Sequence, residues 1–270
     1  MAARQLLPAI ALLLGGSVTH AQMDSAYWVE PVRGPLKIRS IGGVLGVVIE
    51  DHGALGLEDF AGFAAEPLPT TPDDLSDFYF GFNSVALGLE LGPRVTAAHS
   101  MNGAMSDNAW TFHLALIPRV FFLYFTRNDR SGDTLSTTDY IYTMSQTELA
   151  VGAGHIWTLF LGRHLFLQGG LSAELGNAPT ATIDVLGTRT DEINGLTTDR
   201  TLLEGTVRGR GTTSLRGSLT ASVGLRIGRR VDVGPYAQFG TGLMWVHGDA
   251  LRSVLRSDLY ALQVQFLIHR

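Results

Sequence analysis

The sequence of 270 residues contains no cysteine, so it can form no disulfide framework, thiolate metal site or thiol nucleophile. Charged residues are scarce, at 17%, and the net charge of −5 argues against nucleic acid as the main partner. Beyond its N-terminus the sequence also lacks an apolar run of about 18 residues, so we expect no transmembrane helix there. The mean hydropathy is nevertheless slightly positive, at +0.16, and this apolar surface has to be covered in some other way.

The N-terminal residues 1–21 have the features of a secretory signal peptide. Arg4 supplies a positive start, and an apolar core follows over Leu6–Leu14. The alternative is an N-terminal membrane anchor, for which this apolar run is short. We therefore predict export, with cleavage near Ala21, and an N-terminal extension on the periplasmic side over residues 22–35.

Alternation of apolar and polar residues predicts β-strands in the remaining chain, 36–270. The clearest case runs from Ser214 to His247, where apolar residues such as Leu219 alternate with small polar residues such as Ser218 on both sides of one tight turn. Each half is roughly twice as long as a mean strand. Long strands with a small, nearly uncharged polar face are typical of membrane barrels, with lipid outside and a narrow polar lumen inside.

Tight, basic turns recur between these segments, and they are Gly92-Pro93-Arg94, Pro118-Arg119, Gly162-Arg163-His164 and Gly228-Arg229-Arg230. Longer, more polar connections lie between them, and residues 51–77 and 177–213 form the longest loops. The pattern predicts an all-β fold, a transmembrane antiparallel up-and-down β-barrel of about ten strands, within a range of about 8 to 12. Arg94, Arg119, Arg163, Arg229 and Arg230 would then lie in periplasmic turns.

A secreted soluble barrel or sandwich is the alternative fold, but it would have to hide the outward Leu, Val and Phe faces. The signal peptide, alternating strands and short turns resemble those of small bacterial outer-membrane β-barrel proteins, a porin-like class. The closing strand is similar to the C-terminal assembly signal of that class, with Tyr260 and Phe266 as its aromatic residues, although it ends on His269-Arg270. The resemblance implies a location in the cell outer membrane, with outer-membrane lipids and the barrel-assembly machinery as partners.

A charge network is predicted inside the barrel. Its members fall on the polar faces of the strands, and they are Glu90, Glu148, Glu174, Arg226 and His113. Because an isolated charge in a dry lumen is costly, we predict that Arg226 pairs with at least one of the three glutamates. His155 would face lipid if alternation were unbroken, so we expect a bulge at Gly152 or Gly154 to turn it inward.

One stretch has a catalytic appearance, His99-Ser100-Met101-Asn102. It is similar to the His-x-Ser-Asn stretch of lipid A deacylases, but here the serine directly follows the histidine. Adjacent residues of a strand point to opposite faces, so the pair could not cooperate there. We therefore predict no catalytic residues. The histidines lack the spacing of a zinc site and the sequence has no phosphate-binding glycine loop, so we predict no metal site and no cofactor.

These features predict a non-enzymatic barrel with a structural or surface-interaction role. Two alternatives stay open, a narrow channel or carrier for small or apolar molecules and a lipid-hydrolysing enzyme. About ten strands leave little open bore once side chains fill the interior. The sequence leaves open the ligand and the oligomeric state.

Overall fold

The computed structural model describes residues 36–53, 57–69, 79–81, 85–99, 106–162, 164–228, 230–249 and 252–268. The predicted signal peptide and the predicted N-terminal extension lie outside these ranges. Residues Gly34–Arg270 form one compact unit. No helix among the described residues is long and apolar enough to cross a membrane.

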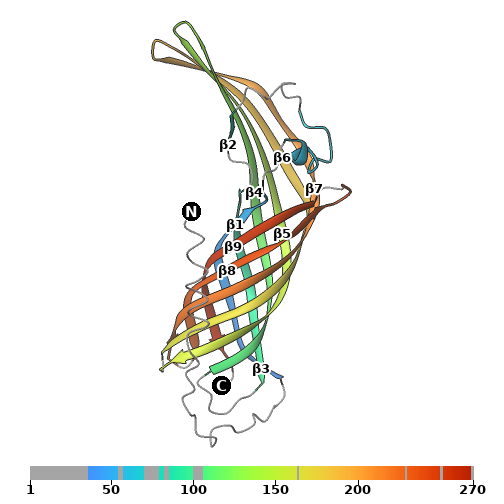
Figure 1. Cartoon of the computed structure of the whole chain (residues 1–270). Helices are drawn as coiled ribbons and strands as arrows, with labels where there is room; N and C mark the ends of the chain where they lie inside the picture. The colour runs from blue at the N-terminus through green and yellow to red at the C-terminus, as the bar shows by residue number, and fades with distance from the viewer. Residues whose placement is uncertain are drawn as a thin grey trace, which may run out of the picture. The chain divides into compact units, whose positions relative to one another are not determined.

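Eight antiparallel strands form a closed ring (Figure 1). They are β1 (Leu36–Asp51), β3 (Val85–His99), β4 (Ser106–Ser131), β5 (Thr134–Leu161), β6 (Leu165–Ile193), β7 (Leu196–Ile227), β8 (Val231–Val246) and β9 (Arg252–Leu267). β1 pairs with β3 and β9, and the pairing of β4 with β5 closes the ring. A short β2 (Tyr79–Gly81) pairs with β4, and a short helix α2 (Leu57–Ala61) precedes it. The predicted antiparallel barrel is confirmed, with eight strands in its ring.

The lower strand number has a simple cause, because two of the four predicted turns lie inside strands. The stretch Gly92-Pro93-Arg94 belongs to β3 and pairs with Gly42–Val44 of β1. Pro118 lies inside β4, opposite Thr147 of β5, and the ladder continues on both sides of it. A proline removes one donor from a long ladder, and the flanking pairs keep the strand extended. The prediction of turns at these two places was therefore wrong.

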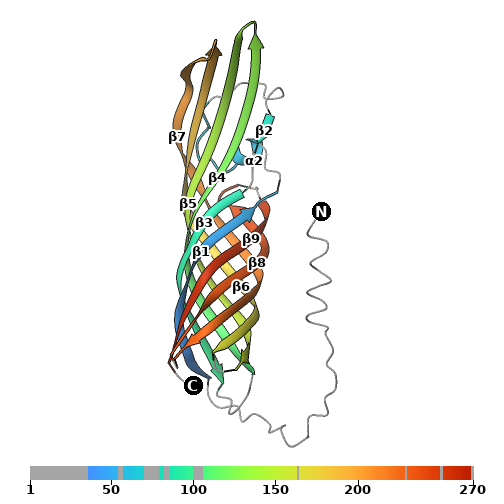
Figure 2. The same ribbon diagram turned by 90° about the vertical axis from the view of Figure 1, so that its left-hand side faces the viewer.

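Four strands are much longer than the ring requires. β4 to β7 contain 26, 28, 29 and 32 residues, whereas β1, β3, β8 and β9 contain only 15 or 16. The hairpins β4–β5 and β6–β7 therefore continue past the ring as a paired extension (Figure 2). At the β6–β7 tip, Asn194 and Gly195 have φ values of 53° and 78°, as in a type I′ turn.

The predicted loop 177–213 is consequently wrong, since most of it belongs to this extension. Toward the tip the segment is mainly polar, which hydropathy alone does not distinguish from a loop, whereas nearer the ring Ala181, Ile183 and Val185 lie in the buried core. It is nevertheless rich in threonine and other β-branched residues, which favour a pleated backbone. We call the end of the ring that carries the hairpins the extension end, and the end with the turns 162–164 and 228–230 the turn end.

An apolar belt covers the outer wall of the ring. Its side chains are about half exposed, and among them are Leu45, Phe112, Leu116, Val151, Leu171, Leu219, Leu225, Leu262 and Phe266. This much exposed hydrocarbon on a closed barrel is the arrangement of a transmembrane strand wall. The fold is thus that of a transmembrane β-barrel.

His155 belongs to this outer wall, so the expected inward bulge is wrong. The β5–β6 register runs without a shift through Gly152 and Gly154, and the irregularity lies instead between Gln146 and Leu149. The imidazole packs edge-on between Trp110 and Trp157, with ring centroids 5.1 and 5.0 Å away. Aromatic side chains of this kind are typical of the membrane–water interface.

The belt predicts a large cost for a buried charge on the outer wall. Replacing Leu114 by arginine should lower the free energy of unfolding by about 2–4 kcal/mol, because the guanidinium would lie in hydrocarbon. Thr182→Arg, on an exposed position of the extension, is the control and should change it by no more than about 0.5 kcal/mol. Urea unfolding in phospholipid vesicles measures both values, and equal effects would contradict a lipid-facing belt.

Candidate functional site

Two arginines and three glutamates meet in the middle of the lumen. Arg119 of β4 contacts Glu148 of β5 through both terminal nitrogens, and its Nη2 lies 2.8 Å from Oε1 of Glu50 in β1. Arg216 of β7 lies 3.1 Å from Glu50, 2.5 Å from Glu148 and 3.4 Å from Glu174 of β6. None of these five side chains is more than 4% exposed. We call this group the lumen network.

Hydrogen-bond donors complete the surroundings of the carboxylates. The Ser214 hydroxyl donates to Glu148 over 2.8 Å, and the Gln238 amide donates to Glu174 over 2.6 Å. The His113 Nε2 lies 3.0 Å from the same Glu174 carboxylate. Several donors and two guanidinium groups therefore share the cost of keeping three carboxylates out of water.

Two glycines of the inward faces provide the space for this network. A Cβ atom added at Gly152 would lie 2.3 Å from the His113 ring, and one added at Gly176 would lie 2.2 Å from the Glu148 carboxylate. Since side chains from facing strands meet in a narrow ring, these strand positions have to be empty for the large polar groups to fit.

Three of the predicted lumen residues lie in this cluster, and these are Glu148, Glu174 and His113. Arg226 does not, so its predicted pairing with a glutamate is wrong. Its Nε and Nη2 atoms each lie 2.7 Å from an Asp232 oxygen, and Phe160 packs 4.7 Å from its guanidinium carbon. The β7–β8 register places Arg226 opposite Asp232, near the turn end. The side chain of Glu90 lies outside the described part of the structure.

The arginines predicted in periplasmic turns have different positions. Arg119 is buried in the lumen network, with 1% exposure, because Pro118-Arg119 does not turn the chain. Arg94 lies inside β3 with its backbone opposite His113, so it is not in a turn either; its side chain lies outside the described part. Arg230 lies in the β7–β8 turn, while Arg163 and Arg229 fall outside the described residues.

Sequence reasoning missed Arg216, Glu50 and His52. Arg216 shares the inward face with Ser214 and Ser218, so its alternation could have placed it in the lumen. Glu50 continues the alternation of β1 on its inward face. Because the predicted loop begins at the next residue, Glu50 was not counted among the lumen residues. Which carboxylate each arginine contacts depends on strands that are far apart in the sequence.

An aromatic cap covers the lumen network on the side of the extension end. Phe60 and Phe63, which are 2% and 1% exposed, pack in one core with Phe121 and Tyr142. The His52 ring joins this cap to the network, because it lies 4.8 Å from Phe121 and 3.8 Å from a Glu50 oxygen. The lumen is thus filled by ion pairs in its middle and by apolar side chains above them.

The segment that carries Phe60 and Phe63 is attached to β7 by backbone hydrogen bonds. The Arg210 amide donates to the Phe63 carbonyl over 2.6 Å, and the Ala65 amide donates to the Arg208 carbonyl over 2.9 Å. The Tyr142 hydroxyl is buried in the cap and finds no hydrogen-bond partner among the described residues. These contacts hold the cap against the wall.

A serine, a histidine and a glutamate form a sequence of contacts beneath the cap. The Ser253 hydroxyl lies 3.4 Å from His52 Nδ1, and His52 Nε2 lies 3.8 Å from Glu50. The second distance is too long for a hydrogen bond, and Glu50 is held by two arginines. Ser253 is only 5% exposed, so it is not presented to a substrate. The side chains of His99 and Ser100 lie outside the described part of the structure.

Polar side chains connect the strands of the extension. The Ser136 hydroxyl of β5 donates to Asp191 of β6 over 2.5 Å, and Arg189 donates to the same carboxylate over 2.9 Å. The Ser136 hydrogen bond and the Arg189 guanidinium lower the pKa of Asp191. No group of three His, Asp or Glu side chains in the described part of the chain has the arrangement of a metal site.

No protein-family model and no curated protein sequence matches the chain. Among solved structures, it is similar to Ail, the attachment invasion locus protein of Yersinia pestis, solved with the heparin analogue sucrose octasulfate. That match has 12% identity and a TM-score of 0.31, covering 86% of this chain and 100% of Ail. Neisserial surface protein A matches at 10% identity and a TM-score of 0.30, covering 87% of this chain and 100% of its own.

The outer-membrane protease OmpT of Escherichia coli is also similar, with 9% identity and a TM-score of 0.20, over 90% of this chain and 100% of OmpT. Likenesses this weak carry no argument about the activity of the chain. Its assignment as a membrane barrel rests on its own ring closure and apolar belt.

The lumen network predicts a strong dependence of stability on Arg119. Arg119→Met should cost about 3–5 kcal/mol of unfolding free energy, because Glu50 and Glu148 lose a buried cation. Arg127→Met, which removes a partly exposed pair with Asp129, is the control and should cost at most about 1 kcal/mol. Adding Glu148→Gln to Arg119→Met should recover part of the loss. Chemical unfolding in detergent measures these values, and a neutral Arg119→Met would contradict the network's structural role.

Proposed function

We propose that this chain is a non-enzymatic outer-membrane barrel that displays its β-extension at the cell surface for interaction with a partner. Outer-membrane barrels have short turns on the periplasmic side and longer elements outside. This rule orients the turn end toward the periplasm and the extension end toward the cell exterior. Outer-membrane lipids and the barrel-assembly machinery are the partners that such a location implies.

The continuation of four paired strands past the belt is the observation that carries this proposal. Cross-strand hydrogen bonds hold the extension together, including Thr190 to Asp199 over 2.8 Å and Thr206 to Asp184 over 2.6 Å. Toward the tip, residues 196–202 of β7 are all exposed. A paired sheet presents a surface that is already ordered, so little entropy is lost when a partner binds.

The filled lumen favours this function over a channel. A continuous pore would have to pass both the lumen network and the aromatic cap, where Arg119, Phe60 and Phe63 are each at most 2% exposed. Small barrels of about eight strands are just wide enough for side chains to fill.

The closed lumen predicts an absence of conductance. The protein inserted into a planar lipid bilayer should show no steady single-channel current, because ion pairs and aromatic rings block the bore. Arg119→Met tests the barrier, since water entering beside the unpaired carboxylates should produce intermittent current. A stable open channel in the unmodified protein would favour the channel function instead.

Shortening the two hairpins tests the display function directly. Arg127, Thr138, Arg189 and Arg200 lie opposite one another on four neighbouring strands. An Asn-Gly turn would therefore replace residues 128–137 in one hairpin and 190–199 in the other. The two shortened hairpins would end side by side, and the cap would stay in place. Bacteria that display the shortened variant should lose most of their adherence to a panel of host-cell and matrix-protein surfaces, relative to bacteria that display the full chain.

The control for this experiment is the folded state of the barrel. Both proteins should show the same heat-dependent shift in gel mobility, which reports an intact barrel. Adherence that is absent in both strains, or equal in both, would argue against a surface-interaction role for the extension.

A further inference from the structure

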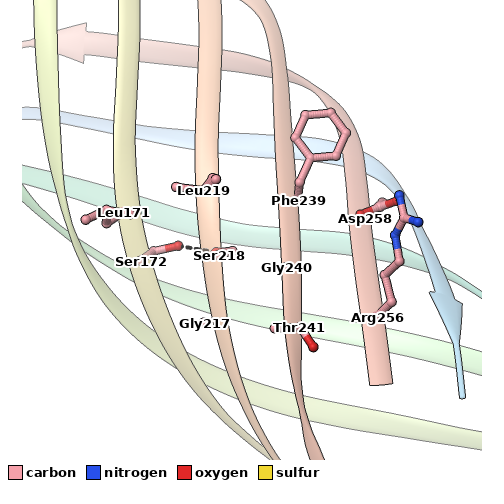
Figure 3. Close-up of a pocket in the computed structure, with 10 residues that line it drawn as sticks. All are labelled: Leu171, Ser172, Gly217, Ser218, Leu219, Phe239, Gly240, Thr241, Arg256 and Asp258. Atoms are coloured by element: carbon pink, nitrogen blue, oxygen red, sulfur yellow. Dashed lines mark hydrogen bonds and ion pairs between the residues drawn. The ribbon is translucent and has the colours of Figure 1, made fainter. Parts of the chain in front are cut away.

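A depression of about 620 Å³ lies in the outer wall, over β6 to β9 (Figure 3). It forms where a row of residues that lie opposite one another on neighbouring strands has only small outward side chains. These are Ala153, Ala173, Gly217 and Thr241, which lie opposite one another on β5 to β8. On β9 the residue opposite Thr241 is Arg256.

Large apolar residues border this row on both sides. One ridge consists of Val151, Leu175, Leu215 and Leu243. The other contains Leu171, Leu219 and Phe239, whose side chains Figure 3 shows in line beside Gly217 and Thr241. The small residues therefore form the floor of a groove, which we call the wall groove.

The dimensions of the wall groove fit one hydrocarbon chain. Four inter-strand spacings of about 4.8 Å give a length of about 19 Å from Ala153 to Arg256. Because transmembrane strands tilt by about 45°, the groove slants and spans about 13 Å of depth, close to one leaflet of a hydrocarbon core about 30 Å thick.

The end of the wall groove carries polar groups that fit a phosphorylated sugar. Arg256 is 70% exposed, and its Nη2 lies 3.0 Å from Asp258 Oδ2. The Asp258 side chain lines the groove and keeps 14% exposure, and a carboxylate oxygen can accept more than one hydrogen bond. A guanidinium group suits a phosphate, and a carboxylate beside it suits a hydroxyl group.

Arg256 lies opposite Asp51, the last residue of β1, at the extension end. With this end outside the cell, which rests on the proposed function, the groove opens into the outer leaflet. We propose that the wall groove binds one phosphorylated glycolipid of the outer leaflet. An acyl chain lies along Gly217, a phosphate contacts Arg256, and a sugar hydroxyl donates to Asp258.

Filling the groove gives a sharp test. A Cβ atom at Gly217 meets no atom within 4 Å, so Gly217→Phe should fold and occupy the groove. Gly169→Phe is the matched control, since Gly169 also lies outward and an added Cβ there meets only a carbonyl oxygen at 3.9 Å. Arg256→Gln removes the charge at the end of the groove while keeping a polar side chain.

Native mass spectrometry of the full chain in detergent micelles, with bis-phosphorylated lipid A or phosphatidylethanolamine added, measures bound lipid. We expect one lipid A per barrel. Arg256→Gln should bind at least about tenfold more weakly, which corresponds to the loss of one charge-assisted hydrogen bond. Gly217→Phe should also bind at least about tenfold more weakly, because its ring occupies the space of the acyl chain. Gly169→Phe should bind as the unmodified protein does. Equal binding of lipid A by all variants would overturn the proposal. It would also be overturned if phosphatidylethanolamine were retained as well as lipid A, or if the protein formed a barrel dimer that Gly217→Phe dissociates. The measurement uses neither conductance nor adherence, so its failure leaves the display function to be judged by its own experiment.

Discussion

The pairing of β4 with β5 closes the ring, and the other features of the molecule depend on that closure. In hydrocarbon every backbone N–H and C=O group has to be paired, and a sheet with an open edge cannot meet this requirement. Closure at eight strands makes the lumen narrow, so inward side chains from facing strands contact one another across it. The outer wall then exposes only the alternate residues, which form the apolar belt and, where those residues are small, the wall groove.

The narrow lumen explains why charged residues gather in one place. A carboxylate such as Glu148 is stable there only beside a cation, and Arg119 and Arg216 each contact more than one carboxylate. Three glutamates share two arginines, and hydroxyl, amide and imidazole groups supply further contacts. The glycines at 152 and 176 belong to the same arrangement, because any side chain there would meet the network.

In the extension, the strands that form the wall of the ring continue as an exposed sheet. Past the belt, many outward residues of the hairpins are threonine or charged, in place of the leucine and valine of the ring. Near the ring the concave side is covered by the aromatic cap, whereas residues 196–202 toward the tip are exposed. One continuous set of strands thereby serves as a membrane wall, a cap support and an exposed sheet.

The sequence alone determined the class of fold and the outward position of residues such as Leu219 and Leu225, because alternation with a period of two is a local property of each strand. It also placed Glu148, Glu174 and His113 on inward faces. Only the tertiary structure decided that Pro118-Arg119 continues a strand, that 177–213 is paired, and that Arg216 takes the place predicted for Arg226. Those outcomes depend on the register between strands, and register is set by ladder and side-chain contacts between residues far apart in the chain.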